Sequence, residues 1–118
     1  MFRVIIAGGR EFADYQLLKE FADYILSNIE DDIEIVSGGA SGADRLGELY
    51  ANERGYQIRR FPADWKRYGY GAGPRRNREM AEYADALIAY WDGESRGTQG
   101  MIALAKQYGL KVRVKRYG

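Results

Sequence analysis

The chain has 118 residues with no cysteine and no histidine, and its 18 basic and 17 acidic residues leave a net charge of +1. The length suits one domain over residues 1–118. The missing cysteines exclude disulfides, zinc–thiolate clusters and thiol nucleophiles, and without histidine we expect no metal site. The charge balance predicts neither a nucleic-acid nor a membrane partner. No apolar run approaches the length of a membrane span, so we expect a cytoplasmic protein.

The N-terminal half alternates between apolar runs and helical patterns. Residues 2–9 (FRVIIAGG) form a short β-branched run that ends in glycine, which predicts a buried strand. Apolar residues at helical spacing predict a helix over 14–29, with Asp14 as its N-cap. We expect a second strand at 33–39 (IEIVSGG) and a second helix over 42–54.

The C-terminal half continues this alternation. A more polar third strand is expected at 56–61, near an edge of the sheet, and one long loop at 62–73. Pro74 suits the first position of a helix that runs to about Tyr83. Three further elements are expected in chain order: a strand at 85–91, a helix over 97–108 and a final edge strand at 110–115.

Strands that alternate with helices, and that read as near-continuous apolar runs, are typical of a parallel sheet covered on both faces. The pattern predicts a Rossmann-like, three-layer α/β domain with a mostly parallel five-stranded sheet. Because crossovers between parallel strands share one hand, all strand-to-helix loops lie at the carboxyl edge of the sheet. Ligands bind at that edge in this architecture.

Loops rich in glycine follow the first, second and fourth predicted strands. Glycine lets a backbone approach a ligand closely and lets neighbouring N–H groups converge on an anion. Any one loop is equally consistent with a tight turn, but three on one edge favour a phosphate-binding pocket. Thr98 is also the expected N-cap of the last helix, and the free N–H groups at that helix start offer a second anion-binding position. The candidate ligand-binding residues in these loops are Gly8, Gly9, Arg10, Ser37, Gly38, Gly39, Ala40, Gly42, Gly93, Gly97 and Thr98.

Arginines crowd the predicted helix start in PRRNREM. With Pro74 at the first helical position, three arginines fall near the positive end of the helix, where each cation costs about 0.3–1 kcal/mol. They are Arg75, Arg76 and Arg78. Such a cluster indicates a bound anion or a carboxylate from another loop, and the alternative is a solvated basic turn. We take Arg75 and Arg76 as candidate ligand-binding residues.

Two carboxylates and two tryptophans on the same edge are further candidates. Asp44 lies three residues after Ser41, a spacing typical of a helix cap, so capping and ligand contact both remain open. Asp64 follows the third strand, where it could bind a ribose hydroxyl or balance the arginines. Trp65 and Trp91 could each stack on a base, although tryptophan also serves as core.

Five stretches, taken in order, resemble the YspA/cpYpsA-related branch of the SLOG superfamily of bacteria and phages over nearly the whole chain. They are AGGREF, SGGASGADRLGELYA, PADWKRYG…AGPRRNREM, ADALIAYWDGESRGT and GLKVRV. The resemblance implies a pocket at the carboxyl edge for a nucleotide or nucleotide-derived ligand. Relatives include LOG-type phosphoribohydrolases, which cut the N-glycosidic bond of a nucleoside monophosphate, together with DNA-processing proteins and ligand sensors.

LOG-type enzymes carry an R-K-x-x-M stretch and a P-G-G-x-G-T-x-x-E stretch, whose arginine and glutamate are linked to catalysis. Here RNREM resembles the first, with Arg76 at the arginine position, Asn77 in place of lysine, and Met80. Asn77 therefore joins the candidate ligand-binding residues. GESRGTQGM resembles the second, but Met101 stands at the glutamate position, and a thioether can neither take a proton nor stabilise a cationic sugar.

The favoured expectation is a domain that binds a nucleotide or nucleotide-derived ligand as a sensor, sequestering or signalling module. The alternative is a hydrolase of a nucleoside monophosphate or related nucleotide, in which Arg76 stabilises charge and Asp44 or Asp64 is the acid or base. Single-stranded nucleic-acid binding is disfavoured by the near-neutral charge. Apart from the nucleotide-type ligand no cofactor is expected. Since related domains commonly dimerise, the resemblance allows a homo-oligomer, a dimer or larger.

Overall fold

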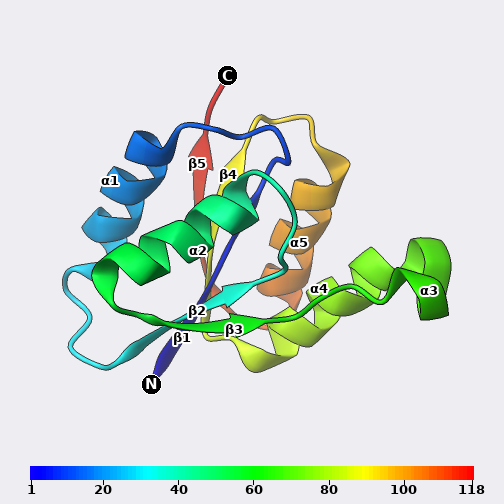
Figure 1. Cartoon of the computed structure of the whole chain (residues 1–118), viewed down its shortest axis with the longest axis horizontal. Helices are drawn as coiled ribbons and strands as arrows, with labels where there is room; N and C mark the ends of the chain where they lie inside the picture. The colour runs from blue at the N-terminus through cyan, green and yellow to red at the C-terminus, as the bar shows by residue number, and fades with distance from the viewer.

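Five parallel strands form the central sheet in the order β3–β2–β1–β4–β5 (Figure 1). The computed structural model describes residues 1–118. The strands are β1 (Phe2–Gly8), β2 (Ile33–Ser37), β3 (Gln57–Arg60), β4 (Ala86–Trp91) and β5 (Lys111–Arg116). The helices are α1 (Tyr15–Leu26), α2 (Ala43–Arg54), α3 (Trp65–Tyr68), α4 (Ala72–Tyr83) and α5 (Arg96–Gln107), with a 3-10 turn, η1 (Gly69–Gly71), between α3 and α4. The predicted α/β class is confirmed, with a sheet that is parallel throughout.

The order of the strands reverses between β1 and β4. The chain moves outward from β1 through β2 to β3, and then crosses back to β4 and β5 on the other side of β1. Val4 at the centre consequently pairs with Ile35 on one side and Ala86 on the other. In such sheets the helices on either side of the reversal diverge, and they leave a crevice above the carboxyl ends of the two strands.

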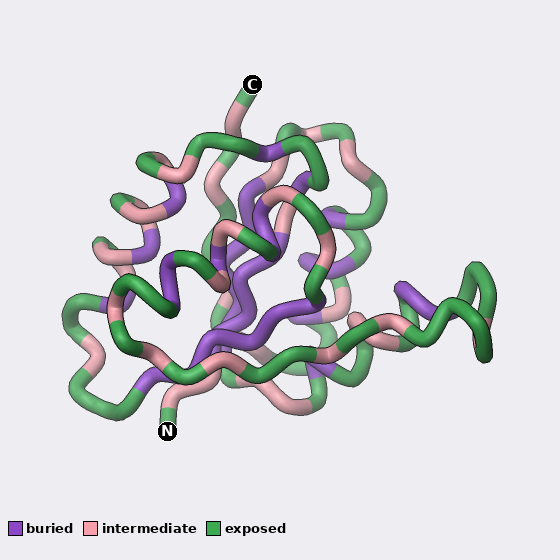
Figure 2. The backbone as a smooth tube through the Cα atoms, in the orientation of Figure 1, coloured by how far each residue is buried: buried purple, intermediate pink, exposed green.

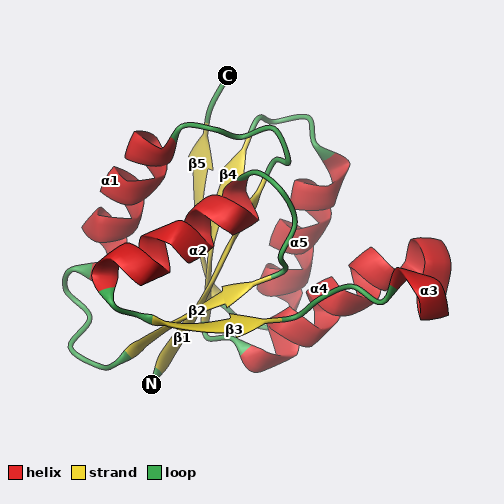
Figure 3. Ribbon diagram, in the orientation of Figure 1, coloured by secondary structure: helices red, strands yellow, loops and turns green.

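Helices cover both faces of the sheet, α1 and α2 on one face and α4 and α5 on the other (Figure 3). Along β1, Val4 and Ile6 pack with α1 and α2, whereas Ile5 and Ala7 pack with α4 and α5. All four are buried, and buried residues run through the centre of the molecule in Figure 2. This two-sided burial explains why β1 reads as a continuous apolar run rather than an alternating one.

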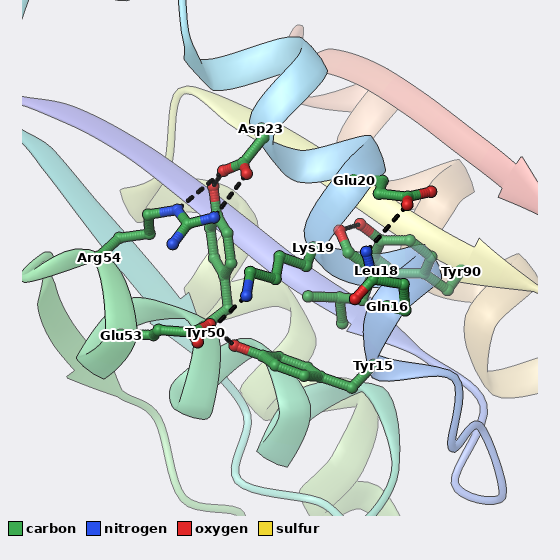
Figure 4. A network of polar contacts seen from close by, with 10 residues as sticks. All are labelled: Tyr15, Gln16, Leu18, Lys19, Glu20, Asp23, Tyr50, Glu53, Arg54 and Tyr90. Atoms are coloured by element: carbon green, nitrogen blue, oxygen red, sulfur yellow. Dashed lines mark hydrogen bonds and ion pairs between the residues drawn. The ribbon is translucent and has the colours of Figure 1, made fainter.

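A polar network joins α1 to α2 across the surface of this layer (Figure 4). Asp23 accepts a hydrogen bond from the Tyr50 hydroxyl at 2.6 Å. Arg54 donates to the same carboxylate from Nε at 3.0 Å and from Nη2 at 2.6 Å. The hydrogen bonds from Arg54 hold the pKa of Asp23 below its usual value. Two further contacts reach Glu53 from Tyr15 at 2.5 Å and from Lys19 at 3.1 Å. The charges of this network are therefore matched within the protein.

The segment expected as a loop over 62–73 contains the α3 helix and the η1 turn, and this part of the prediction is wrong. These turns run directly into α4, which begins at Ala72, so Pro74 is its third residue instead of its first. Proline is tolerated there because an N–H in the first turn of a helix has no acceptor within the helix, so its absence breaks no hydrogen bond. The arginines after Pro74 consequently lie beyond the free N–H groups of the helix start.

The α3 helix and η1 stand out from the body of the protein (Figures 1 and 2). Within this segment Tyr70 is fully exposed and Trp65 is half exposed. Asp64 caps α3, since its carboxylate accepts the Arg67 N–H at 3.2 Å. None of the helices has both the length and the apolar character that crossing a membrane requires.

Candidate functional site

A cleft of about 760 Å³ lies at the carboxyl edge of the sheet, where the strand order reverses. The end of β1 borders it, as do Asp92 directly after β4, the start of α2, α4 between Gly73 and Met80, and α5 between Arg96 and Leu104. Its position agrees with the edge predicted from the strand-to-helix loops. The cleft brings together ten of the residues singled out in the sequence: Gly8, Gly9, Arg10, Ala40, Asp44, Trp65, Arg76, Asn77, Gly97 and Thr98.

Arg76 connects α4 to the loop between β2 and α2. Its Nη1 donates to the Gly38 carbonyl oxygen at 2.5 Å, and its Nε donates to Asn77 Oδ1 at 2.9 Å. Both acceptors are neutral, so no carboxylate is hydrogen-bonded to this guanidinium. Partial burial lowers the pKa of Arg76, with the nearby Asp44 acting against the shift. Segments separated by 38 residues thus meet at one cation.

Asp44 lies in the first turn of α2 and is only 6% exposed. Its Oδ2 accepts the Ala40 N–H at 3.2 Å, while Gly42, not Ser41, is the N-cap residue. Burial raises the pKa of Asp44 to about 6, opposed by the Ala40 hydrogen bond and by Arg76. The cleft therefore holds a carboxyl group that changes its charge near neutral pH.

Two glycines of the β2–α2 loop are required by contacts within the protein. A Cβ at Gly38 would lie 2.7 Å from Arg76 Nη1 and 2.8 Å from Asp44 Oδ2. Gly42 has φ +79°, and a Cβ there would lie 2.2 Å from the Gly9 carbonyl oxygen. These glycines let charged side chains and a neighbouring loop approach closely, so a tight assembly of protein segments explains both of them.

Arg10 is exposed at the rim of the cleft, and its side chain takes part in no intramolecular hydrogen bond or ion pair. It lies near enough to Arg76 to contribute to the lowered pKa of that group. Positive charge therefore collects at this end. The charge of the cleft as a whole is balanced, because its lining contains three arginines and three carboxylates: Arg10, Arg76, Arg96, Glu11, Asp44 and Asp92.

The start of α5 forms the opposite end of the cleft. Ser95 is the N-cap, and its Oγ accepts the Thr98 N–H at 3.5 Å, so the prediction of Thr98 as the cap is wrong by one turn. Thr98 is instead buried, with Oγ1 at 3.3 Å from Ser95 Oγ. Asp92 accepts the N–H groups of Glu94 and Ser95, each at 2.8 Å, and these bonds lower its pKa.

An apolar wall between α4 and α5 completes the cleft. Met80 and Met101 are both 2% exposed and line it together with Leu104. Trp65 borders the same space. Met101, at the position of the catalytic glutamate of LOG-type enzymes, thus lies in the site but contributes only an apolar surface.

Tyr117 is a lining residue that the sequence reasoning missed. It follows the end of β5 and packs on Phe12 with ring centroids 4.7 Å apart. A Cβ at Gly9 would lie 2.2 Å from its hydroxyl. The sequence did hold one signal for Tyr117, since this aromatic residue directly follows the last strand. All strands of a parallel sheet end at the carboxyl edge, so Tyr117 could have been expected there. Glu11, Asp92 and Leu104 were also missed.

Six of the predicted residues face away from the cleft or are occupied elsewhere. Ser37 donates its hydroxyl to Glu48 at 2.7 Å. Arg75 lies over the Tyr68 ring, 4.3 Å from its centroid. The Trp91 indole donates to the Ser95 carbonyl oxygen at 3.0 Å. The other three are Gly42, packed on the β1 loop, Asp64, the cap of α3, and Gly93, packed beneath Arg116. Gly38 and Gly39 line an adjoining hollow.

The strand order and the crevice at its reversal define a Rossmann-like α/β domain. The chain belongs to the YspA, cpYpsA-related SLOG family, whose model matches residues 2–68. It is 31% identical over 118 aligned residues to the Gene 61 protein of Mycobacterium phage D29, an alignment that covers 95% of this chain and 94% of that protein. The family match ends before Arg76, so the α4 and α5 walls of the cleft lie outside the matched segment.

The fold is shared with a solved structure, the X-ray structure of DNA processing protein A (DprA) from Streptococcus pneumoniae. The TM-score is 0.73 at 19% sequence identity, over 99% of this chain and 50% of that chain. This chain therefore spans about half the length of DprA, and at this identity the likeness establishes the fold alone.

Proposed function

We propose that this SLOG domain binds a nucleotide or a nucleotide-derived ligand in the cleft, as a sensor, sequestering or signalling module. The observation that carries the proposal is the pair of guanidinium groups, Arg10 and Arg76, that meet beside the β2–α2 loop without a carboxylate hydrogen-bonded to either. Charge-assisted hydrogen bonds to phosphate oxygens would use donors that the protein leaves free.

The remaining lining supports the other parts of a nucleotide. Glu11 and Asp92 can accept hydrogen bonds from ribose hydroxyls, as carboxylates do in related crevices. Leu104, backed by the buried Met80 and Met101, provides an apolar surface on which a base can lie, with the Trp65 ring as a further partner for stacking. A cleft of about 760 Å³ falls within the usual range for small-ligand sites.

Asp44 supports a second candidate function, hydrolysis of the N-glycosidic bond of a nucleoside monophosphate. A general acid works best with a pKa near the working pH, and burial raises the pKa of Asp44 to about 6. Arg76 beside it would stabilise developing negative charge. Met101 weighs against this candidate because it stands where the LOG-type stretch has its catalytic glutamate, and a thioether cannot do the work of a carboxylate.

Thermal denaturation with AMP, GMP, CMP and UMP tests the proposal. A ligand at 100 times its dissociation constant stabilises the folded state by about 2.7 kcal/mol, a shift of several degrees. We expect at least one nucleotide to give this shift without releasing free base on chromatography. Release that Asp44→Asn abolishes would establish the hydrolase instead. The absence of any shift and of any release would contradict both candidates.

A further inference from the structure

A second hollow adjoins the cleft on the far side of the two arginines. Its volume is about 460 Å³, and it lies between the β2–α2 loop and the segment that leads from β3 into α3. The two spaces share four lining residues, Arg10, Ala40, Trp65 and Arg76, which form a rim that we call the neck. Both guanidinium groups therefore border both spaces.

The neck is suited to hold an anion. Arg76 uses two of its N–H groups, toward Gly38 and Asn77, and a guanidinium carries more donors than these. Arg10 uses none of its side-chain donors within the protein. Arg10 also lies close enough to disfavour the charge of Arg76, although the larger effect of the nearby Asp44 opposes it. A phosphate between them would take up the free donors and remove the repulsion.

The lining of the second hollow is otherwise uncharged. Beyond the neck it consists of small or neutral residues from two loops: Gly38, Gly39, Ser41, Pro62 and Ala63. The Trp65 side chain, 51% exposed, offers a ring surface at its border. This lining suits a ring-bearing unit without negative charge better than a further phosphate, because no cation remains to pair with a phosphate.

We propose that the natural ligand has two ring-bearing units joined through a phosphate or pyrophosphate. The anionic link lies at the neck, one unit lies in the cleft and the other lies in the second hollow. This inference rests on the proposed function and narrows its ligand class. The cleft alone accommodates a mononucleotide, since small-ligand sites span about 300–1,000 Å³, so a mononucleotide would leave the second hollow unused.

Calorimetric titrations with AMP, ADP and NAD⁺ test the inference. ADP has the pyrophosphate but lacks a second ring-bearing unit. ADP is also the more negative ligand, so tighter binding of NAD⁺ at a cationic neck would come from the second unit and not from charge. We expect NAD⁺ to bind about tenfold tighter than ADP or better. In the variant Ala63→Trp an indole fills the second hollow, and NAD⁺ affinity should fall to the level of ADP while AMP affinity is unchanged.

Ala103→Trp is the matched control, since Ala103 is exposed on α5 and borders neither space. Ser41→Trp fills the hollow from the opposite loop and serves as a second variant should Ala63→Trp fail to fold. Equal affinities for ADP and NAD⁺, or a loss of AMP binding equal to that of NAD⁺ in the filled variants, would overturn the inference and leave the proposed function standing. No thermal shift with any of the four mononucleotides, together with no binding of AMP, ADP or NAD⁺, would remove the proposed function, and this inference with it.

Discussion

Two clusters of arginine and carboxylate in this molecule are built in opposite ways. In the α1–α2 network, Arg54 and Tyr50 both donate to the Asp23 carboxylate. At the cleft, Arg76 donates only to neutral oxygens, and Arg10 donates to nothing. The first cluster satisfies its own charges and holds two helices together. The second has cationic donors to spare, which is the arrangement expected where an anion from outside completes the bonding.

The largest expected effect is on stability, from Asp23→Ala. The change leaves the buried Tyr50 hydroxyl and the Arg54 guanidinium without their acceptor, so we expect a loss of about 2 kcal/mol in the free energy of unfolding, measured by urea denaturation. AMP affinity should stay the same because the network lies outside the cleft. If Asp23→Ala weakened AMP binding and left the free energy of unfolding unchanged, the two clusters would not have the separate roles described above.

Arg10→Ala should show the reverse behaviour. Removing a side chain without an internal partner should change the free energy of unfolding by no more than about 0.5 kcal/mol. Losing a charge-assisted hydrogen bond to phosphate should weaken AMP binding about tenfold, as measured by calorimetry. A marked loss of stability in this variant would show that Arg10 supports the fold instead.

Gly38→Ala sharpens the comparison by testing how closely the cationic cluster is packed. The added Cβ meets Arg76 Nη1 at 2.7 Å, so we expect it to displace the guanidinium and to cost about 1–2 kcal/mol of stability. In the double variant with Arg76→Ala the contacts with the guanidinium are gone, and only the one with Asp44 Oδ2 at 2.8 Å remains. The two costs should then sum to more than the cost of the double variant. Strict additivity in denaturation experiments would rule out this contact.

The smallest expected effect is the pH dependence contributed by Asp44. Burial raises its pKa in the folded protein to about 6 from an ordinary 3.8, so the folded state binds this proton more tightly than the unfolded state does. The resulting stability is complete below about pH 4 and is lost as the pH rises through about 6. Between pH 5 and 8 the wild type should therefore lose about 1 kcal/mol that Asp44→Asn does not lose. Parallel pH profiles for the two proteins would refute the raised pKa.

The architecture could be predicted from the sequence because local patterns determine it. Continuous apolar runs such as FRVIIAGG indicate strands buried on both faces, and the Asp14 cap of α1 is confirmed by its acceptance of the Leu17 N–H at 3.0 Å. The carboxyl-edge location of the loops then follows from the handedness of the crossovers. The segment around α3 was missed because four residues of helix and a 3-10 turn give too short a pattern to detect.

The site was predicted only in part, since side-chain direction depends on three-dimensional packing. Arg75 and Arg76 are indistinguishable in PRRNREM, yet one lies over Tyr68 and the other reaches Gly38. Trp65 follows β3 and Trp91 ends β4, but the indole of Trp91 donates to the Ser95 carbonyl oxygen in the loop after that strand. Tyr117 joins the cleft through a contact with Phe12, a pairing across 105 residues that no local pattern encodes.

The central claim is that the cationic end of the cleft binds the phosphate of a nucleotide. Calorimetric titration of AMP into the wild type, Arg76→Ala and Arg75→Ala tests it most directly, because the two variants remove the same charge from adjacent residues. We predict that Arg76→Ala weakens binding by about tenfold to a hundredfold and that Arg75→Ala leaves it unchanged. Equal losses in both variants, or no loss in either, would contradict the account.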